Sequence, residues 1–307
     1  MTDLPQALDP VSRPRDGTLT MPSLLRAGLR GPALRLAAAL LGLLLAASCG
    51  PLVQEAPEAR EARLAPSWRL VQPEGPGRRP AAIVLSGCDG VHDNMAFWAE
   101  ALARRGRAVL ILDSHAPRGL DRDPAWRLVC AGQVLRGAER AGDVAAALDA
   151  LARSPGVDAS DVVLLGASHG GWTAMEFVGL AATGRTPPGL ARWPEPPAAM
   201  LGRISALVLL YPYCGLLNGA RAGEWRGAPP TLMILSERDR VVSAPACAER
   251  AEALGATGAE VRVEVMPGAD HGFDQAEKSP LSPLPFDPAR RALALEATQE
   301  FLDGLGL

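Results

Sequence analysis

A serine flanked by small residues, in the segment Gly166-Ala167-Ser168-His169-Gly170, is the feature of the sequence most able to carry chemistry. The segment follows an apolar, β-type run and opens a helical pattern. G-x-S-x-G in this setting is the nucleophile-elbow motif, in which a sharp turn exposes the serine hydroxyl. The glycines are needed because strand and helix pass too close for a Cβ. We therefore predict Ser168 as a nucleophile, and a glycine-rich turn with an idle serine is the alternative.

A serine hydroxyl is a poor nucleophile until a base takes its proton, and histidine is the usual base. In elbow-type enzymes the base follows the last strand of the sheet. His271 meets that condition, after the predicted strand 261–265. His92 and His115 precede the elbow and are expected in structural or pocket-wall roles, and His169 in a wall role. We predict His271 as the base; a surface loop histidine is the alternative.

The acid that orients the base should follow the preceding strand, 231–235. Ser236-Glu237-Arg238-Asp239-Arg240 offers two carboxylates there. We predict Asp239 over Glu237, because several residues of loop are needed to reach the imidazole. Its role would be to fix the imidazole tautomer and stabilise the imidazolium. A solvated loop charge is the alternative.

A tetrahedral oxyanion needs preorganised hydrogen-bond donors, each worth about 3–4 kcal/mol of barrier. One donor is expected from the residue after the nucleophile, which is the backbone N–H of His169. The second is expected from the loop after an earlier strand, Ser86-Gly87-Cys88-Asp89-Gly90. We assign the backbone N–H of Cys88 as this second donor.

The elements that must position these residues alternate between short apolar runs and longer helical patterns. Repeated β-then-α units predict an α/β fold with a mostly parallel central sheet and helices on both faces. In such sheets the working site lies beyond the carboxyl ends of the strands. The segment 68–72 is expected to add an antiparallel edge strand. The predicted buried strands are 81–85, 108–112, 162–165, 204–211, 231–235 and 261–265. The predicted helices are 94–105, 138–153, 170–182, 245–254 and 289–305.

Several blocks of sequence, taken in order, resemble the dienelactone hydrolase family of α/β hydrolases over about residues 80–275. The blocks are Ile83–Gly90, Asp113–Gly119, Gly166–Gly171, Tyr211–Cys214 and Pro267–Phe273. The resemblance implies the α/β-hydrolase fold and hydrolysis of esters or lactones with no metal and no cofactor. Enzymes acting on dienelactone itself have cysteine at the elbow where this chain has Ser168. Family members often have histidine before the oxyanion-loop glycine, where this chain has Ser86.

The first 48 residues have the pattern of an export signal. Arg26, Arg30 and Arg35 precede an uncharged apolar run, 36–47, that is too short to span a bilayer. We predict a signal peptide over 1–48, with Met21 as a candidate true start.

The cysteine where this apolar run stops resembles a bacterial lipobox cysteine. We expect Cys49 to be lipidated, which would anchor the protein to a membrane; an ordinary secretory signal is the alternative. Residues 49–66 are rich in Pro, Ala, Glu and Arg without an apolar period, so we expect a flexible tether. The α/β-hydrolase domain is expected over 67–307. The predicted location is periplasmic, or membrane-anchored as a lipoprotein, in a bacterium.

Export makes disulfide bonds plausible for the remaining cysteines, Cys88, Cys130, Cys214 and Cys247. Their spacing does not match a zinc or thioredoxin-type site. Four cysteines permit three pairings, and chain order favours Cys88 with Cys130 and Cys214 with Cys247. Four inert buried thiols are the alternative.

Composition gives no indication of a nucleic-acid or anionic-membrane partner. The net charge is −3 with both signs interspersed, which gives no footprint for nucleic acid. We predict an exported esterase-like hydrolase with a small-molecule ester or lactone substrate. The alternatives are a peptidase or acyltransferase on the same scaffold, and a catalytically silent binding lipoprotein. The oligomeric state is not indicated.

Two further segments bear on the substrate. Arg118 is placed to meet a substrate carboxylate or to be an ordinary loop arginine. The Pro/Gly-rich stretch Gly184–Pro197 is expected to be either a partial lid or a surface excursion.

Overall fold

The structure of the protein is a computed structural model. It describes residues 53–307, apart from residues 121, 223–224, 226 and 279–281. This part of the chain contains one seven-stranded sheet in the order β1-β3-β2-β4-β5-β6-β7. Strand β1 runs antiparallel to β3, and the other neighbouring strands are parallel. The strands are β1 (Arg69–Val71), β2 (Arg79–Leu85), β3 (Ala108–Leu112), β4 (Val157–Ala167), β5 (Ile204–Leu210), β6 (Thr231–Ser236) and β7 (Val261–Met266).

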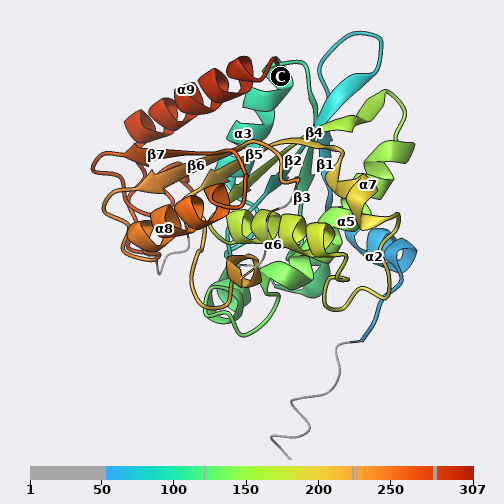
Figure 1. Ribbon diagram of the computed structural model, residues 1–307, viewed down its shortest axis with the longest axis horizontal. Helices are drawn as coiled ribbons and strands as arrows, with labels where there is room; N and C mark the ends of the chain where they lie inside the picture. The colour runs from blue at the N-terminus through green and yellow to red at the C-terminus, as the bar shows by residue number, and fades with distance from the viewer. Residues whose placement is uncertain (1–52, 121, 223–224, 226, 279–281) are drawn as a thin grey trace, which may run out of the picture. The chain divides into compact units, whose positions relative to one another are not determined.

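Helices cover both faces of the sheet (Figure 1). The longer helices α5, α6 and α8 pack on one face, and α3 and α9 pack on the other. The helices are α2 (Pro57–Leu64), α3 (Asp93–Arg104), α4 (Arg122–Pro124), α5 (Gly137–Arg153), α6 (His169–Thr183), α7 (Pro197–Leu201), α8 (Ala244–Gly255) and α9 (Pro288–Gly304). Short 3₁₀ turns lie at Ala65–Ser67, Ala116–Arg118 and Gly219–Ala222, and a π turn at Ala125–Val129.

The central strands are buried on both faces, which explains their uninterrupted apolar sequences. Every side chain from Ala81 to Leu85 in β2 and from Ala206 to Leu210 in β5 is fully buried. A strand covered on both faces gains stability at each position and does not need polar alternation. The predicted α/β architecture is confirmed, and β4 is longer than expected because it continues back to Val157 across a register shift.

Strand β7 corrects one prediction, because it is not buried on both faces. It lies at the edge of the sheet, with β6 as its one neighbour. Val265 is 51% exposed. The charged side chains of Arg262 and Glu264 pair with each other at 2.8 Å. An edge strand has fewer elements packed against it, and of the six residues of β7 only Met266 is buried.

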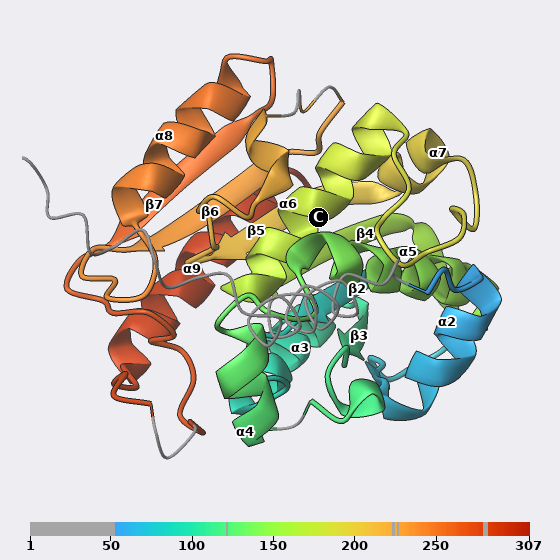
Figure 2. The same ribbon diagram turned by 90° about the horizontal axis from the view of Figure 1, so that it is seen from below.

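The segment expected to be a flexible tether is partly helical. Helix α2 begins with Pro57 at its first position, has Glu58 in its first turn and ends with Arg63 in its last turn. These are favourable end residues for a helix, because they suit its φ angle and its dipole. The helix lies against α5 (Figure 2). The domain therefore begins before residue 67.

A buried ion pair holds α2 in place. Arg60 is 4% exposed and donates from Nη1 to Asp143 of α5 at 2.8 Å and from Nη2 to the Gly189 carbonyl at 2.6 Å. Both Arg60 and Arg63 also pair with Glu55. Leu64 is fully buried at the end of the helix. This docking depends on charges far apart in sequence, so it leaves no apolar period in the segment itself.

The export elements lie outside the described residues. The predicted signal peptide 1–48 and Cys49 belong to the segment whose placement is not described. Among the helices that the structure does describe, none has the length and apolar character to cross a membrane.

We expect acid to weaken the docking of α2. Hydrogen bonds from Arg63 and Arg60 lower the pKa of the Glu55 carboxyl to about 2 from 4.5. A carboxyl with a depressed folded-state pKa stabilises the fold above pH 4.5 and loses that stability as the pH falls toward 2. Because the pair is partly exposed, its contribution is roughly 1 kcal/mol.

Glu55→Gln should therefore lower the free energy of unfolding in urea near neutral pH by roughly this amount. The difference in the free energy of unfolding between this variant and the wild type should become smaller as the pH is lowered from about 5 to about 3. A difference that stays constant over this range would contradict the role given to Glu55.

Candidate active site

Ser168 lies in a sharp turn between β4 and α6, and α6 begins at the next residue. Its backbone angles are φ 51° and ψ −110°, which L-amino acids rarely adopt. A Cβ on Gly166 would lie 2.4 Å from the backbone of Gly170, and a Cβ on Gly170 would lie 2.2 Å from the Leu85 carbonyl oxygen. Both positions must therefore be glycine, and the tight packing exposes the serine hydroxyl at the carboxyl edge of the sheet.

Three side chains from separate loops form a hydrogen-bonded chain. Ser168 Oγ lies 2.8 Å from His271 Nε2, and His271 Nδ1 lies 2.8 Å from Asp239 Oδ2. The other carboxylate oxygen of Asp239 accepts from the backbone N–H groups of Val241 and Val242, at 2.9 and 2.8 Å. A carboxylate only accepts, so Nδ1 carries the imidazole proton and Nε2 is free to accept from serine. The structure thus brings together the three residues predicted from the sequence.

The loops that carry these residues follow adjacent strands. Asp239 comes three residues after the end of β6, and His271 comes five residues after the end of β7. The side chains of Asp239 and His271 are 1% and 8% exposed. Burial strengthens their interaction because little water screens it. The arrangement has the geometry of a nucleophile, a base and an orienting acid.

A buried tyrosine, which the sequence analysis did not single out, packs against His271. The Tyr211 and His271 rings meet edge to face with centroids 4.8 Å apart. The Tyr211 hydroxyl donates to Asp274 Oδ1, and the Trp98 indole N–H donates to Asp274 Oδ2 at 2.7 Å. Burial raises the pKa of both Tyr211 and Asp274. Tyr211 directly follows β5 and has a φ of 37°. The sequence signal that could have indicated it is a tyrosine at the carboxyl end of a predicted strand.

Two further aspartates lie close to His271 in sequence, Asp270 and Asp274, and neither is hydrogen-bonded to its ring nitrogens. Asp270 accepts from the backbone N–H groups of Arg240 at 3.1 Å and His271 at 2.8 Å, and pairs with the Arg240 side chain. Asp274 is held by Tyr211 as described above. Asp270 therefore orders the loop that carries the histidine, while Asp239 orients the ring.

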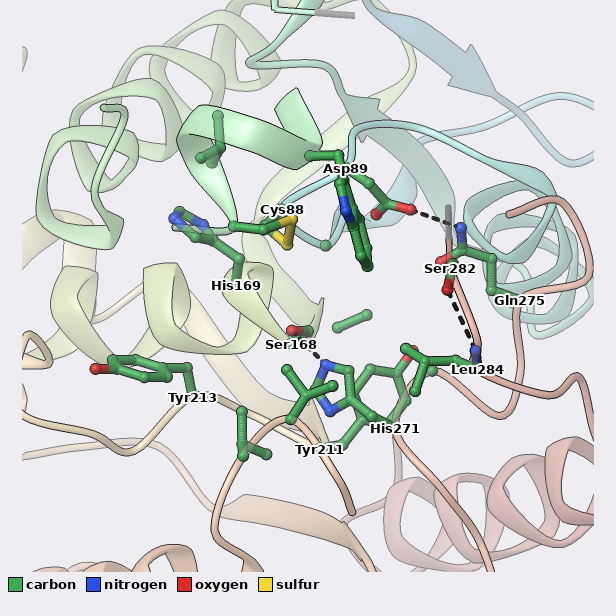
Figure 3. Close-up of a pocket in the computed structure, with 18 of the residues that line it drawn as sticks. Cys88, Asp89, Ser168, His169, Tyr211, Tyr213, His271, Gln275, Ser282 and Leu284 are labelled. Atoms are coloured by element: carbon green, nitrogen blue, oxygen red, sulfur yellow. Dashed lines mark hydrogen bonds between the residues drawn. A yellow bond between two sulfur atoms is a disulfide. The ribbon is translucent and has the colours of Figure 1, made fainter. Parts of the chain in front are cut away.

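The expected oxyanion-hole residues lie on either side of the serine. Cys88 is in the loop after β2, and His169 is the first residue of α6. A Cβ on Gly87, next to Cys88, would lie 4.0 Å from the Ser168 Cβ, so this loop passes directly beside the nucleophile. Cys88, Ser168 and His169 line the same cavity (Figure 3). The N-terminal end of α6 also favours negative charge at this point.

The other three histidines occupy the surroundings predicted for them. Burial together with the charge of Arg140 lowers the pKa of His115 to about 3 and that of His169 well below its usual range. Both rings are therefore neutral at ordinary pH. Although burial opposes it, the hydrogen bond and charge of Asp89 raise the pKa of His92.

A cavity of about 210 Å³ opens beside Ser168. Tyr213 and Gln275 lie on opposite sides of the serine (Figure 3). The cavity walls combine an aromatic and aliphatic side with a smaller polar side. The apolar side chains include Trp126, Val129, Trp172, Tyr213, Leu217, Val241, Val242 and Leu284, and the polar ones Asp89, Asn94, Gln275, Lys278 and Ser282. Within the described ranges, three or more side chains able to hold a metal ion do not gather anywhere.

A disulfide bond braces the loop that carries the second expected oxyanion donor, Cys88. It joins Cys88 to Cys130, which follows the π turn Ala125–Val129. Residues of that turn and the glycine Gly132 line the cavity. The bond therefore links one wall of the cavity to the loop beside Ser168.

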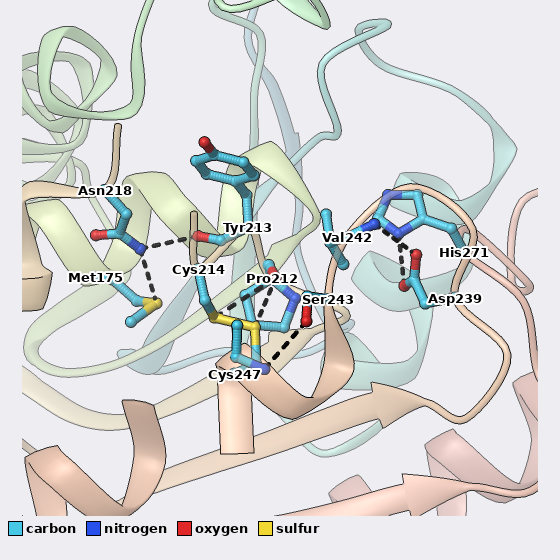
Figure 4. Close-up of a disulfide and its surroundings, with 11 residues drawn as sticks. Met175, Pro212, Tyr213, Cys214, Asn218, Asp239, Val242, Ser243, Cys247 and His271 are labelled. Atoms are coloured by element: carbon cyan, nitrogen blue, oxygen red, sulfur yellow. Dashed lines mark hydrogen bonds and ion pairs between the residues drawn. A yellow bond between two sulfur atoms is a disulfide. The ribbon is translucent and has the colours of Figure 1, made fainter. Parts of the chain in front are cut away.

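A second disulfide bond joins Cys214, in the loop after β5, to Cys247 of α8 (Figure 4). Cys214 follows Tyr213 of the cavity wall. The residues just before α8, including Val242, belong to the loop that holds Asp239. These two bonds are the pairs that chain order favoured.

Arg118 does not reach the cavity. Its two terminal nitrogens donate to the buried carboxylate of Asp143, both at 2.9 Å, and one also donates to the Ser114 carbonyl at 2.7 Å. Of the two roles considered for Arg118, contact with a substrate carboxylate is therefore not supported, because an internal carboxylate already binds this side chain.

The stretch Gly184–Pro197 is not a lid. Its backbone pairs with Glu55 through the Gly189 carbonyl and the Ala191 N–H, at 3.0 and 2.8 Å. Trp193 packs edge to face against Phe177 of α6. The stretch is held beside α2, and other segments form the cavity walls.

Comparisons with known proteins agree with this fold. The structure is similar to that of a dienelactone hydrolase-like promiscuous phosphotriesterase from metagenomic libraries, with a TM-score of 0.62 and 21% identity over 78% of this chain and 92% of the other. It is also similar to Thermogutta terrifontis esterase 2 phosphonylated by cyclosarin, with a TM-score of 0.55 and 21% identity over 78% and 89%. At these identities the similarity shows the shared fold.

A comparison with curated protein sequences finds no significant match. The sequence matches the profile of the dienelactone hydrolase family over residues 68–186 and 198–305, which is most of the chain. The chain therefore belongs to the dienelactone hydrolase family, with the α/β-hydrolase fold and the ester-hydrolase chemistry for which that family is named.

Proposed function

We propose that the protein is an exported serine hydrolase that cleaves a carboxylic ester or lactone through an acyl-enzyme on Ser168. One observation carries this proposal, namely the unbroken hydrogen-bonded chain from Ser168 Oγ through His271 to Asp239. An idle serine in a glycine-rich turn would not need a histidine at 2.8 Å with a carboxylate held behind it.

The proposed reaction has two steps. Ser168 Oγ attacks the carbonyl carbon while His271 Nε2 takes the hydroxyl proton, and the oxyanion accepts from the backbone N–H groups of Cys88 and His169. The carbon–oxygen bond to the leaving group then breaks, and His271 returns the proton to the departing alkoxide. Water enters, gives a proton to His271 and attacks the acyl carbon. The bond from that carbon to Ser168 Oγ then breaks, His271 returns the proton to Oγ, and the acid is released. With a lactone, the alcohol stays attached to the acyl group.

The cavity favours an uncharged, apolar acyl or aryl substrate. Its aromatic side offers rings for contact, and burial of apolar surface is worth about 25 cal/mol per Å². Among the described residues that line it, the one with a cationic side chain is Lys278. The Lys278 ammonium already donates to the carbonyl oxygens of Gly272 and Pro285, at 2.9 and 3.3 Å. With Arg118 bound to Asp143, no arginine in the described cavity wall awaits a substrate carboxylate.

The proposal includes export and anchoring. Two disulfide bonds in one domain suit an oxidising compartment, where such bonds persist. The basic and apolar pattern before Cys49 suits a cleaved signal, and Cys49 is the proposed site of lipidation. The protein would then be held at a membrane by its lipid alone.

Ser168→Ala should abolish turnover of activated esters, with a loss of at least about 10⁴-fold in kcat, because the acyl-enzyme can no longer form. A panel of esters and lactones of increasing acyl length measures this. Ser160→Ala, on the exposed far end of the same strand, is the matched control and should keep full activity. Esterase 2 is phosphonylated by cyclosarin, so a fluorophosphonate probe should label the wild type and not the Ser168 variant. A wild type that resists the probe would favour a silent binding protein.

Asp239→Asn should lower kcat by roughly 10³- to 10⁴-fold while the fold persists, because the amide no longer fixes the reactive tautomer of His271. Glu237→Gln is the matched control, since Glu237 lies in the same loop and accepts from the Gly268 N–H at 2.7 Å. That control should retain activity within about threefold, as a loop substitution outside the hydrogen-bonded chain. A large loss of kcat in Glu237→Gln, with activity retained in Asp239→Asn, would identify Glu237 as the acid.

Cys49→Ser should move the protein from the membrane pellet to the soluble fraction when it is expressed in a bacterium with its own leader. The reason is that a diacylated cysteine supplies most of the membrane affinity of such a protein. Turnover per enzyme molecule should not change. Fractionation with immunodetection, and the mass of the N-terminal peptide, provide the measurement. Wild-type protein found free of the membrane would contradict the lipid anchor and leave the hydrolase proposal intact.

A further inference from the structure

Arg140 is fully buried in a place that does not favour a cation. It is the fourth residue of α5, near the positive end of that helix dipole. Within the described part of the chain, no carboxylate lies within ion-pair distance of its guanidinium. The nearby buried carboxylate of Asp143 is bound instead by Arg60 and Arg118. Burial of an incompletely paired charge costs several kcal/mol, so this side chain is destabilising unless its contacts compensate.

Those contacts join two segments on either side of the nucleophile. Arg140 Nη1 donates to the Ser86 carbonyl at 3.0 Å and lies 2.9 Å from His169 Nδ1, and Nη2 lies 3.4 Å from Ser86 Oγ. Ser86 lies two residues before Cys88, and His169 directly follows Ser168. One guanidinium therefore ties together the two segments that carry the expected oxyanion-hole donors.

The contact also fixes the state of His169. A guanidinium can only donate, so Nδ1 of His169 must be its unprotonated, accepting nitrogen. Burial and the charge of Arg140 lower the pKa of His169 well below its usual range, which keeps the ring neutral. His169 as a whole is 4% exposed, and its backbone carbonyl accepts from Thr173 Oγ1 at 2.9 Å. His169 is thus held on both its side chain and its backbone.

We propose that Arg140 is a positioning residue for the oxyanion hole, setting the distance between the Cys88 and His169 amides. This inference rests on the proposed acyl-enzyme function. Arg140 holds the loop after β2 from inside the domain, while the bond from Cys88 to Cys130 holds it from the cavity side. Its positive charge, in a low-dielectric interior, also favours the negative charge that develops on the carbonyl oxygen.

The first test compares kcat for each active molecule. Arg140→Met should lower kcat by roughly 30-fold, because small displacement of preorganised donors costs one to two orders of magnitude. The KM should change by less than about threefold, since the donors act mainly on the transition state. Active sites are counted by fluorophosphonate labelling to completion, so that molecules that fail to fold do not enter kcat. Arg140→Lys keeps the charge but cannot bond both segments, and should recover only part of the loss.

Arg107→Met is the matched control. Arg107 is also buried, at 1% exposure, and it donates to a backbone carbonyl, that of Ala81 in β2 at 3.0 Å. It lies just before β3, at the amino ends of the parallel strands and away from Ser168. Its loss should destabilise the fold and leave kcat per labelled site unchanged.

A pair of ketone inhibitors separates positioning from general damage. An aryl trifluoromethyl ketone forms an oxyanion with the serine, whereas the matching methyl ketone binds without one. Arg140→Met should weaken binding of the trifluoromethyl ketone by about the same factor as it lowers kcat. Binding of the methyl ketone should change by less than about threefold. The pH dependence of kcat/KM should keep its midpoint, because His271 and Asp239 are untouched.

Normal kcat per site with normal trifluoromethyl ketone binding would overturn the role of Arg140, and so would an equal loss for both ketones. If Arg140→Met does not fold, the same measurements on Arg140→Lys decide the question. A wild type that neither turns over esters nor reacts with fluorophosphonate would instead overturn the proposed function itself.

Discussion

The close approach of three backbones around Ser168 is the constraint on which the rest of the site depends. With no room for a Cβ on Gly166 or Gly170, strand β4 can turn into α6 within one residue and hold Ser168 at a positive φ. Such strain persists only where the surrounding structure over-determines it. Here β2 lies on one side of β4 and β5 on the other, and their segments Ala81–Leu85 and Ala206–Leu210 are fully buried. The order β2-β4-β5-β6-β7 then places the loops of Cys88, Asp239 and His271 along the same edge as the serine.

Charge inside the domain is arranged in separate groups with different consequences. Asp143 pairs with two arginines, so its burial helps to attach α2 and the loop after β3. Asp274 accepts from the neutral donors Trp98 and Tyr211 behind His271, and burial raises its pKa. Arg140 has the opposite character, a buried cation that pairs with no carboxylate among the described residues, beside the site where negative charge is proposed to develop.

The sequence predicts those features that local pattern determines. Runs of apolar β-branched residues give the strands, and their order together with the elbow motif places Ser168, Asp239 and His271 in one site. Features made by tertiary contacts escaped prediction. Helix α2 docks through the buried side chain of Arg60 rather than through an apolar stripe. The partner of Arg60 is Asp143, which is far along the chain, so the spacing of residues in the segment does not indicate the contact. Arg118 looked available for the same reason, because its partner is visible only in the fold.

The two disulfide bonds restrain loops that form the cavity. Each closes a long loop, with sequence separations of 42 and 33 residues, and loops of this length imply about 4 kcal/mol of stabilisation from the unfolded state. Their positions suggest more than bulk stability, since one ends beside the oxyanion loop at Cys88 and the other beside Tyr213. A cavity whose walls are loops rather than strands needs such restraints to keep donors fixed to within fractions of an ångström. The two bonds therefore affect the geometry around Ser168 as well as the stability of the domain.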